Sequence, residues 1–158
     1  MHPTHNDLPE ATRSKISGLL NERLADAIDL QTQVKQAHWN VKGPTFIALH
    51  QLFDQVNGDV VEYVDLLAER AVQLGATAEG TARTAARRST LPEYPLQITS
   101  GPDHVAALTA ALAAFGKLAR QGITAAAEWG DADTADLFTE ISRGVDKWLW
   151  MVEAHAQK

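Results

Sequence analysis

The chain has 158 residues, enough for one domain with a substantial core, and 45% of them are hydrophobic. It contains no cysteine, which excludes disulfides, thiolate zinc sites and cysteine-ligated iron–sulfur clusters. The net charge of −6 argues against an extended nucleic-acid surface, and no apolar run is long enough to span a membrane. The first residues, MHPTHNDLPEATR, have neither the basic start nor the apolar stretch of a secretory signal, so we expect a cytoplasmic protein.

The first predicted helix follows a short N-terminal tail of residues 1–8. Asp7 can cap this helix, Pro9 suits its first turn, and apolar residues at helical spacing continue to about His38. The turn at residues 41–44, which reads VKGP, then interrupts the pattern because glycine and proline continue a helix poorly.

A second helix and a long connection follow this turn. Thr45 can cap the helix, and apolar residues at helical spacing extend to Gly75. Residues 76–101 show no sustained period, although residues 80–89 could form a short helix. A crossover of this length lets the second and third helices of a four-helix bundle run parallel.

Two further helices complete the chain. Ser100 and Asp103 come close to a capping box at the start of the third helix, which ends near Gly130. The fourth helix begins within residues 130–136. We therefore predict an all-α fold, a single domain of residues 1–158, in which four helices form an up-down-down-up bundle around a purely apolar core.

The end of the first helix and the second helix carry five possible metal ligands. These are His38, His50, Asp54, Asp65 and Glu69. Imidazole and carboxylate groups together suit iron(II), zinc or manganese. His50 and Asp54 are four residues apart, as are Asp65 and Glu69, so each pair lies on one face of a helix.

The spacing between these pairs is more informative than the pairs themselves. His50 and Asp65 are 15 residues apart on one predicted helix, which corresponds to roughly 22 Å at the rise of an α-helix. One helix cannot place both around the same ion. If the candidates form one site, a second copy of the helix must run antiparallel beside the first. The sequence therefore predicts a metal site shared between two subunits.

Each candidate ligand also has a simpler interpretation. His38 or His50 alone would more often be a cap or a surface residue, and Asp65 with Glu69 could form a solvated helix face. The coincidence along the second helix favours the metal. Positions 50, 54 and 65 share one narrow stripe, which would make a poor core seam and suits contact with another polar face across a two-fold axis.

Several segments match a known family. The run QAHWNVKG, then HQLFD twelve residues after its histidine, then VDLLAERAVQLG, strongly resemble the Dps proteins, the DNA-binding proteins from starved cells, also called miniferritins. YPL at 94–96, DTADLFTEISR at 133–143 and DKWLW at 146–150 also look like family segments. The resemblance covers nearly the whole chain from about residue 12.

The resemblance implies ferritin-like four-helix bundles assembled as a hollow dodecamer, with ferroxidase centres at two-fold interfaces. It assigns His38, His50 and Asp54 to one subunit and Asp65 and Glu69 to its mate. A metal centre inside the bundle is not expected, because the chain lacks the Glu-x-x-His motif of the usual ferritin-like site.

The resemblance also implies an activity. Iron(II) would be oxidised, preferably by hydrogen peroxide, and stored as iron(III) mineral in the cavity, which would protect DNA from oxidative damage. Iron is thus the implied metal, and zinc could substitute because it accepts the same ligands. Trp39 matches a tryptophan that the family associates with the centre, although it could equally pack an interface.

In similar proteins, acidic residues at the start of the last helix line a three-fold pore. Asp131, Asp136 and Glu140 are the matching candidates here. Asp131 or Asp133 could alternatively cap the helix, and Asp136 would interact favourably with the helix dipole.

The family name suggests an alternative function, a nucleoid-associated protein that protects DNA by binding it. Charge argues against strong binding. The N-terminus has no lysine before Lys15, the C-terminal EAHAQK has one, and Arg87 with Arg88 form only a small patch. We therefore expect other copies of the chain as the main partner, with weak DNA binding.

Overall fold

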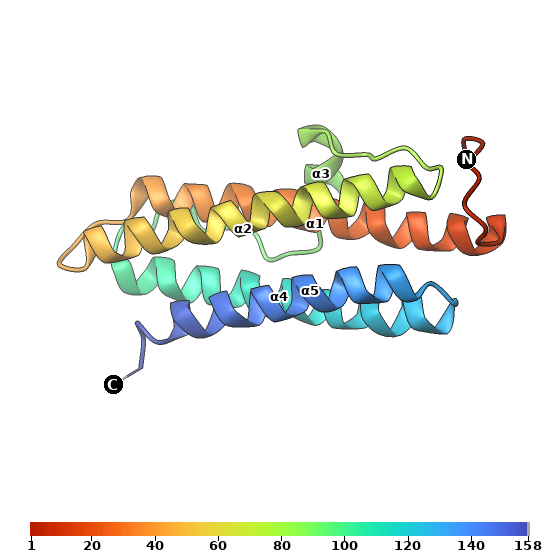
Figure 1. Cartoon of the computed structure of the whole chain (residues 1–158). Helices are drawn as coiled ribbons and strands as arrows, with labels where there is room; N and C mark the ends of the chain where they lie inside the picture. Colours follow the sequence, from red (N-terminus) through yellow and green to blue (C-terminus); the bar gives the residue numbers. More distant parts are fainter. Residues whose placement is uncertain (158) are drawn as a thin grey trace.

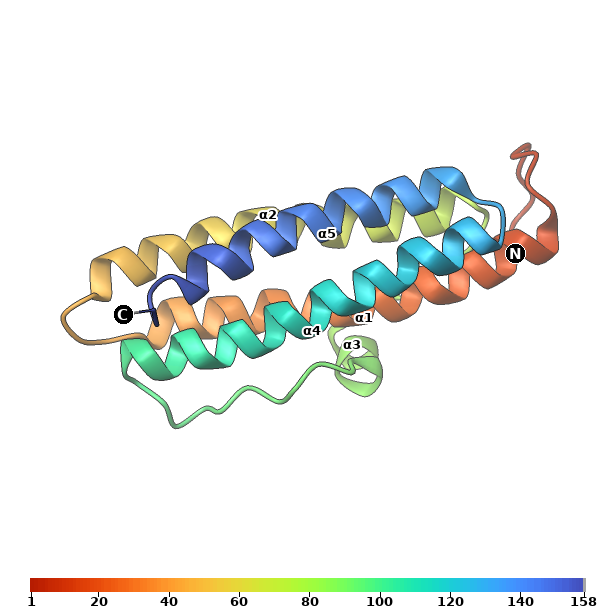
Figure 2. The same cartoon turned by 90° about the horizontal axis from the view of Figure 1, so that it is seen from below.

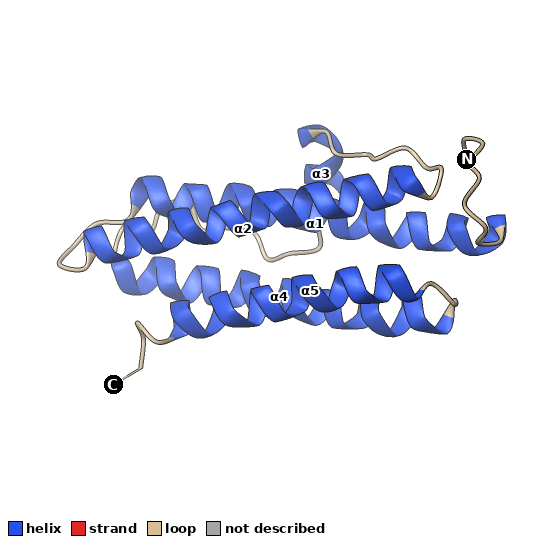
Figure 3. Ribbon diagram, in the orientation of Figure 1, coloured by secondary structure: helices blue, strands red, loops and turns tan. Residues whose placement is uncertain are grey.

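The computed structural model describes residues 1–157, which fold into four long helices and one short helix (Figures 1 and 3). The helices are α1 (Glu10–Asn40), α2 (Phe46–Gln73), α3 (Ala82–Arg88), α4 (Gly101–Glu128) and α5 (Ala132–Glu153). Within these described residues no strand forms, although an isolated bridge pairs Lys42 with Ser100. The predicted all-α class is confirmed.

The long helices form two hairpins packed against each other. α1 lies beside α2, and α4 lies beside α5 (Figures 1 and 2). The crossover between α2 and α4 returns along the bundle, so these two helices run in the same direction (Figure 2). The α3 helix packs on α1 within this crossover. This is the predicted up-down-down-up order.

Apolar side chains from all four long helices fill the bundle. The largest fully buried ones include Phe53, Phe115 and Phe138, and burial of such a side chain contributes about 1.5–3 kcal/mol. Gly122 explains the close approach of α4 and α5, because a Cβ there would lie 2.9 Å from the Phe138 ring. A side chain at this position would have to displace the aromatic ring.

The core is not purely apolar, so that part of the prediction was wrong. Within residues 1–157, ten polar or charged side chains are buried, and the charged ones lie where elements meet. Arg23 pairs with Asp26 at 2.8 Å, and Asp26 also accepts hydrogen bonds from the amide and hydroxyl of Thr90. The Thr90 hydrogen bonds connect α1 to the crossover. Arg23 balances the charge of the buried Asp26 carboxylate, because an isolated buried charge would be costly.

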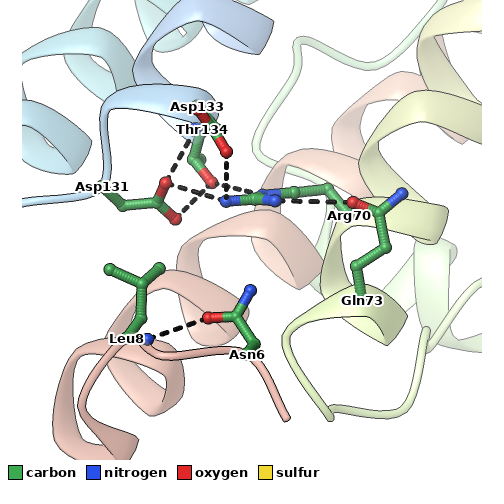
Figure 4. Close-up of polar contacts among 7 residues, drawn as sticks. All are labelled: Asn6, Leu8, Arg70, Gln73, Asp131, Asp133 and Thr134. Atoms are coloured by element: carbon green, nitrogen blue, oxygen red, sulfur yellow. Dashed lines mark hydrogen bonds and ion pairs between the residues drawn. The ribbon is translucent and has the colours of Figure 1, made fainter. Parts of the chain in front are cut away.

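A second buried ion pair joins the end of α2 to the start of α5 (Figure 4). Arg70 Nη2 lies 2.8 Å from Asp131 Oδ1, and Arg70 Nε donates to Thr134 Oγ1 at 2.9 Å. Asp131 caps α5 by accepting from the Thr134 amide at 3.0 Å. The two hairpins are therefore connected by a charge-assisted network as well as by the core.

The predicted helix starts were correct in part. Ser100 caps α4 through the Asp103 amide, as predicted. Thr45 lies at the N-cap of α2 but makes no side-chain capping bond. Asp7 does not cap α1, because that helix begins only at Glu10, with Pro9 in extended backbone at its N-cap. In the part of the chain that the structure describes, no helix is long and apolar enough to cross a membrane.

Candidate metal centre

Two histidines meet where α1 turns into α2. His38 lies in the last turn of α1 and His50 near the start of α2. The intervening turn folds α2 back along α1, with Gly43 at a φ of 111°, a conformation that favours glycine. The two rings are stacked, with centroids 3.8 Å apart. The sequence predicted both residues as ligands, and the fold makes them neighbours.

The hydrogen bonds of these histidines define their tautomers. His38 Nδ1 lies 2.8 Å from the His50 carbonyl oxygen, and His50 Nδ1 lies 2.8 Å from the His38 carbonyl oxygen. A carbonyl oxygen only accepts, so each Nδ1 must carry the proton and donate it. In the neutral ring Nε2 then keeps its lone pair. Metal-binding histidines are commonly oriented in this way.

Asp54 lies one turn after His50 and is exposed to solvent. Its Oδ1 atom is 4.0 Å from His38 Nδ1 and accepts a hydrogen bond from Lys35 Nζ at 2.8 Å. The hydrogen bond from Lys35 and its positive charge hold the pKa of Asp54 below its usual value. Asp54 is therefore ionised at neutral pH. His38, His50 and Asp54 line one open depression on the surface, together with Gln51 and Gln55.

Asp65 and Glu69 are exposed on the same helix but far from this depression. α2 is continuous from Phe46 to Gln73, so the predicted separation of roughly 22 Å between His50 and Asp65 applies. Among residues 1–157, no three His, Asp or Glu side chains are arranged to hold a metal ion. Within one chain, the five candidates form two separate sets, both open to solvent.

The pore candidates differ in their surroundings. Asp131 is only 2% exposed, and its carboxylate is held by Arg70 and Thr134 (Figure 4). The capping prediction is confirmed for Asp131, and its pore role stays a prediction. Asp136 and Glu140 are exposed on α5, so a pore role remains open to them.

One residue at the centre was missed by the sequence reasoning. Lys35 lies one helical turn before His38 and pairs with Asp54. The sequence indicated only that a lysine lies one turn before the candidate ligand His38. Which carboxylate it pairs with depends on how α2 packs against α1. Beside it, Trp39 is 67% exposed and lines a groove with Tyr94 and Leu96.

Comparisons with known proteins agree with this fold. The ferritin-like domain family matches residues 18–158. The DNA protection during starvation protein of Agrobacterium fabrum is 45% identical over 157 residues, which cover 99% of this chain and 97% of that protein.

Solved structures give the same result. DpsC from Streptomyces coelicolor superposes with a TM-score of 0.93 at 31% identity, covering 100% of this chain and 91% of that one. Mycobacterium smegmatis Dps superposes with a TM-score of 0.94 at 28% identity, covering 100% and 90%. The sequence match, the crossover and the helix order all agree, and the chain belongs to the Dps family of ferritin-like proteins.

Proposed function

We propose that this protein is a ferroxidase that binds iron(II) between two subunits and stores the oxidised iron inside a hollow dodecamer. The observation that carries the proposal is the division of the ligands. His38 and His50 use Nδ1 to donate to each other's carbonyl oxygen and line one surface depression, while Asp65 and Glu69 lie on a distant part of α2. Only another chain can complete the set.

The donor set suits iron chemistry. Two imidazole nitrogens favour iron(II), and three carboxylates provide the hard, anionic oxygens that favour iron(III). The set also leaves room for an oxidant, as reactive metal sites do. Zinc accepts the same ligands and would compete as a substitute. Iron is here the substrate that the site collects, oxidises and releases to the mineral.

Peroxide is the oxidant that fits a paired site. Two iron(II) ions give up one electron each, and one hydrogen peroxide takes both electrons and two protons to form two waters. This stoichiometry avoids the hydroxyl radical that a single iron(II) would generate. DNA would be protected because both reagents are removed. Asp136 and Glu140 could attract iron(II) at a pore into the shell.

Direct DNA binding is the second candidate, suggested by the name of the Agrobacterium fabrum relative. The N-terminal tail gives it little support. The His2 amide donates to the Gly75 carbonyl at 2.6 Å, and Arg13 Nη1 donates to the Leu74 carbonyl at 3.0 Å. The start of the tail thus contacts the end of α2 through His2, and residues 1–8 contain no lysine.

The test is anaerobic loading with iron(II), followed by titration with hydrogen peroxide while ferric absorbance and protein-bound iron are followed. We expect oxidation of about two irons per peroxide, as the electron balance requires, with the iron retained in a large soluble particle. Asp65→Ala should lose the rapid phase, whereas the exposed Asp133→Ala should keep it. Iron that remains reduced, or precipitates away from the protein, would contradict the proposal.

A further inference from the structure

A buried histidine at the start of α4 takes no part in the candidate centre. His104 is only 1% exposed, and its Nδ1 atom lies 2.5 Å from the hydroxyl oxygen of Tyr94, a buried residue of the crossover. The two rings are stacked, with centroids 6.1 Å apart. In the part of the chain that the structure describes, His104 Nε2 is buried without a full hydrogen bond, although the Asn40 carbonyl acts on the ring. His104 therefore connects α4, the crossover and the end of α1.

The proton positions follow from these partners. Burial raises the pKa of Tyr94, so its hydroxyl keeps its proton at neutral pH. Among residues 1–157, this hydroxyl has no hydrogen-bond partner other than His104 Nδ1. The Tyr94 hydroxyl thus donates to Nδ1, which must be unprotonated to accept, and the proton of the ring is on Nε2, towards the Asn40 carbonyl. This arrangement exists only while His104 is neutral.

The crossover has few other polar contacts around Tyr94. No hydrogen bond joins the main chain of residues 91–98 to the main chain of a helix within the described residues (Figure 2). Besides the Tyr94 contact, Gln33 donates to the Pro92 carbonyl at 3.0 Å. Packing against the core comes from three side chains, Leu91, Tyr94 and Ile98. A segment held mainly by side chains opens locally more easily than a helix does.

Protonation of His104 would break its contact with Tyr94. A charged imidazole donates from both nitrogens, so Nδ1 can no longer accept. Burial lowers the pKa of His104 from its ordinary value of 6.5, and this outweighs the Asn40 carbonyl and the Asp103 carboxylate, which raise it. The ionisable side chains on the surrounding elements are Asp103 on α4, His38 and Lys42 near the end of α1, Glu93 in the crossover and Glu153 at the end of α5. Of these, Asp103 acts on His104, and its charge does not offset the burial.

We propose that His104 is an acid-sensitive contact, which holds residues 91–98 against the bundle through Tyr94 when it is neutral and releases them when it takes up a proton. The closed segment binds this proton less tightly than the open one. The stabilisation is therefore complete above about pH 6.5 and is lost as the pH falls below that value. Tyr94 also lines the groove beside Trp39, so acid would loosen one wall of that groove. The inference does not rest on the proposed function.

Hydrogen–deuterium exchange of the whole protein at about pH 7.5 and about pH 5.0 tests the proposal. Each pH unit below the ordinary histidine pKa raises the open population about tenfold while the closed form stays neutral. After correction for the intrinsic pH dependence of exchange, residues 91–98 should therefore exchange between about tenfold and about 30-fold faster at the lower pH. Amides within α4 should keep their rates. An unchanged corrected rate for residues 91–98 would overturn the proposal.

His104→Gln separates the charge of this residue from its hydrogen bonds. Glutamine offers an acceptor and a donor but cannot be charged, so residues 91–98 should exchange slowly at both pH values. His5→Gln is the matched control, because it removes an exposed histidine from the tail at the opposite end of the bundle (Figure 2). This control should keep the acid response. An acid response in His104→Gln as large as in the wild type would contradict the proposal.

Tyr94→Phe gives a second test that remains valid if His104→Gln does not fold. This variant lacks the donor, so residues 91–98 should exchange at least about fivefold faster than in the wild type already at about pH 7.5, the effect of one lost buried hydrogen bond. Wild-type exchange in Tyr94→Phe would show that the contact does not hold the segment. Iron oxidation is not part of these measurements, so the inference and the proposed function can fail separately.

Discussion

Lys35 and Asp54 form an ion pair inside one half of the candidate centre, at 2.8 Å. Lys35 also lies over the Trp39 ring, 5.8 Å from its centroid. Its ammonium group occupies a position next to a ligand carboxylate and carries the same charge sign as the incoming metal. If Asp54 binds the metal as proposed, Lys35 would compete for its carboxylate, and we expect this lysine to weaken metal binding.

Lys35→Met removes this competition. We expect cobalt(II), as a redox-inactive probe, to bind about 2–5-fold more tightly, the range that an exposed ion pair can account for. Isothermal titration calorimetry measures the change. Lys42→Met, which removes an exposed lysine from the neighbouring turn, should leave the affinity unchanged. Unchanged or weaker binding in Lys35→Met would show that the lysine assists the site.

Tyr63 gives a prediction at alkaline pH. Burial, together with Asp59 and Glu140, raises the pKa of Tyr63 from 10.0 to about 12. The folded state thus holds the phenolic proton more tightly than the unfolded state. Its stabilisation is complete below pH 10 and is lost as the pH rises towards 12.

Tyr63→Phe should therefore unfold at a higher pH than the wild type, as followed by circular dichroism during alkaline titration. Tyrosinate absorbance of the wild type should rise only near the unfolding transition, because burial also raises the pKa of Tyr94, the other tyrosine. Early tyrosinate absorbance in the folded protein would contradict the assignment.

At the scale of elements, the joint between α2 and α5 depends on Arg70 and Asp131. Asp131→Ala removes the helix cap and leaves the Arg70 guanidinium buried without its carboxylate. We expect a loss of about 3–5 kcal/mol in the free energy of unfolding, measured with urea. The Asp133 side chain is 86% exposed. Asp133→Ala should therefore lower the free energy of unfolding by less than about 0.5 kcal/mol. Similar losses for both variants would show that the contact between Arg70 and Asp131 contributes little to the free energy of unfolding.

The helices themselves were largely predictable from the sequence. Apolar spacing and the breaks at Gly43, Gly75 and Gly130 gave the four long helices, because positive φ angles at these glycines end a helix or form a turn. That Asp7 does not cap α1 was not predictable, because whether a polar residue caps a helix depends on where the preceding tail packs. That tail contacts Gly75, which is far away in the chain, through the His2 amide.

For the candidate centre, the division of the ligands was predictable from the sequence, but their local contacts were not. The spacing of His50, Asp54 and Asp65 already indicated that a single site containing all three would need two chains, because the rise of a helix places His50 and Asp65 far apart. The tautomers of the histidines and the Lys35 pair were not accessible, because both depend on how α1 and α2 pack. The burial of Asp131 required Arg70, which approaches from another hairpin.

At the scale of the whole molecule, the net negative charge argues against DNA binding as the alternative function. The chain carries 14 lysine and arginine residues against 20 aspartate and glutamate residues, and binding to duplex DNA requires phosphates to be neutralised by many cations. We expect no gel shift of duplex DNA at about 150 mM salt and at most weak retardation near about 20 mM, because contacts to phosphates weaken as the salt concentration rises. Tight binding at the higher salt would contradict the charge argument.

The central claim is that each ferroxidase centre is built from two chains, and mixing two inactive variants tests it most directly. His50→Ala breaks one half-site and Asp65→Ala breaks the other. In mixed assemblies, half of the two-fold pairs would contain one chain of each kind and regain one intact centre of their two. We predict that peroxide-dependent iron oxidation, absent from either variant alone, returns to about a quarter of the wild-type level. Mixtures that stay as inactive as their parents would contradict a shared centre.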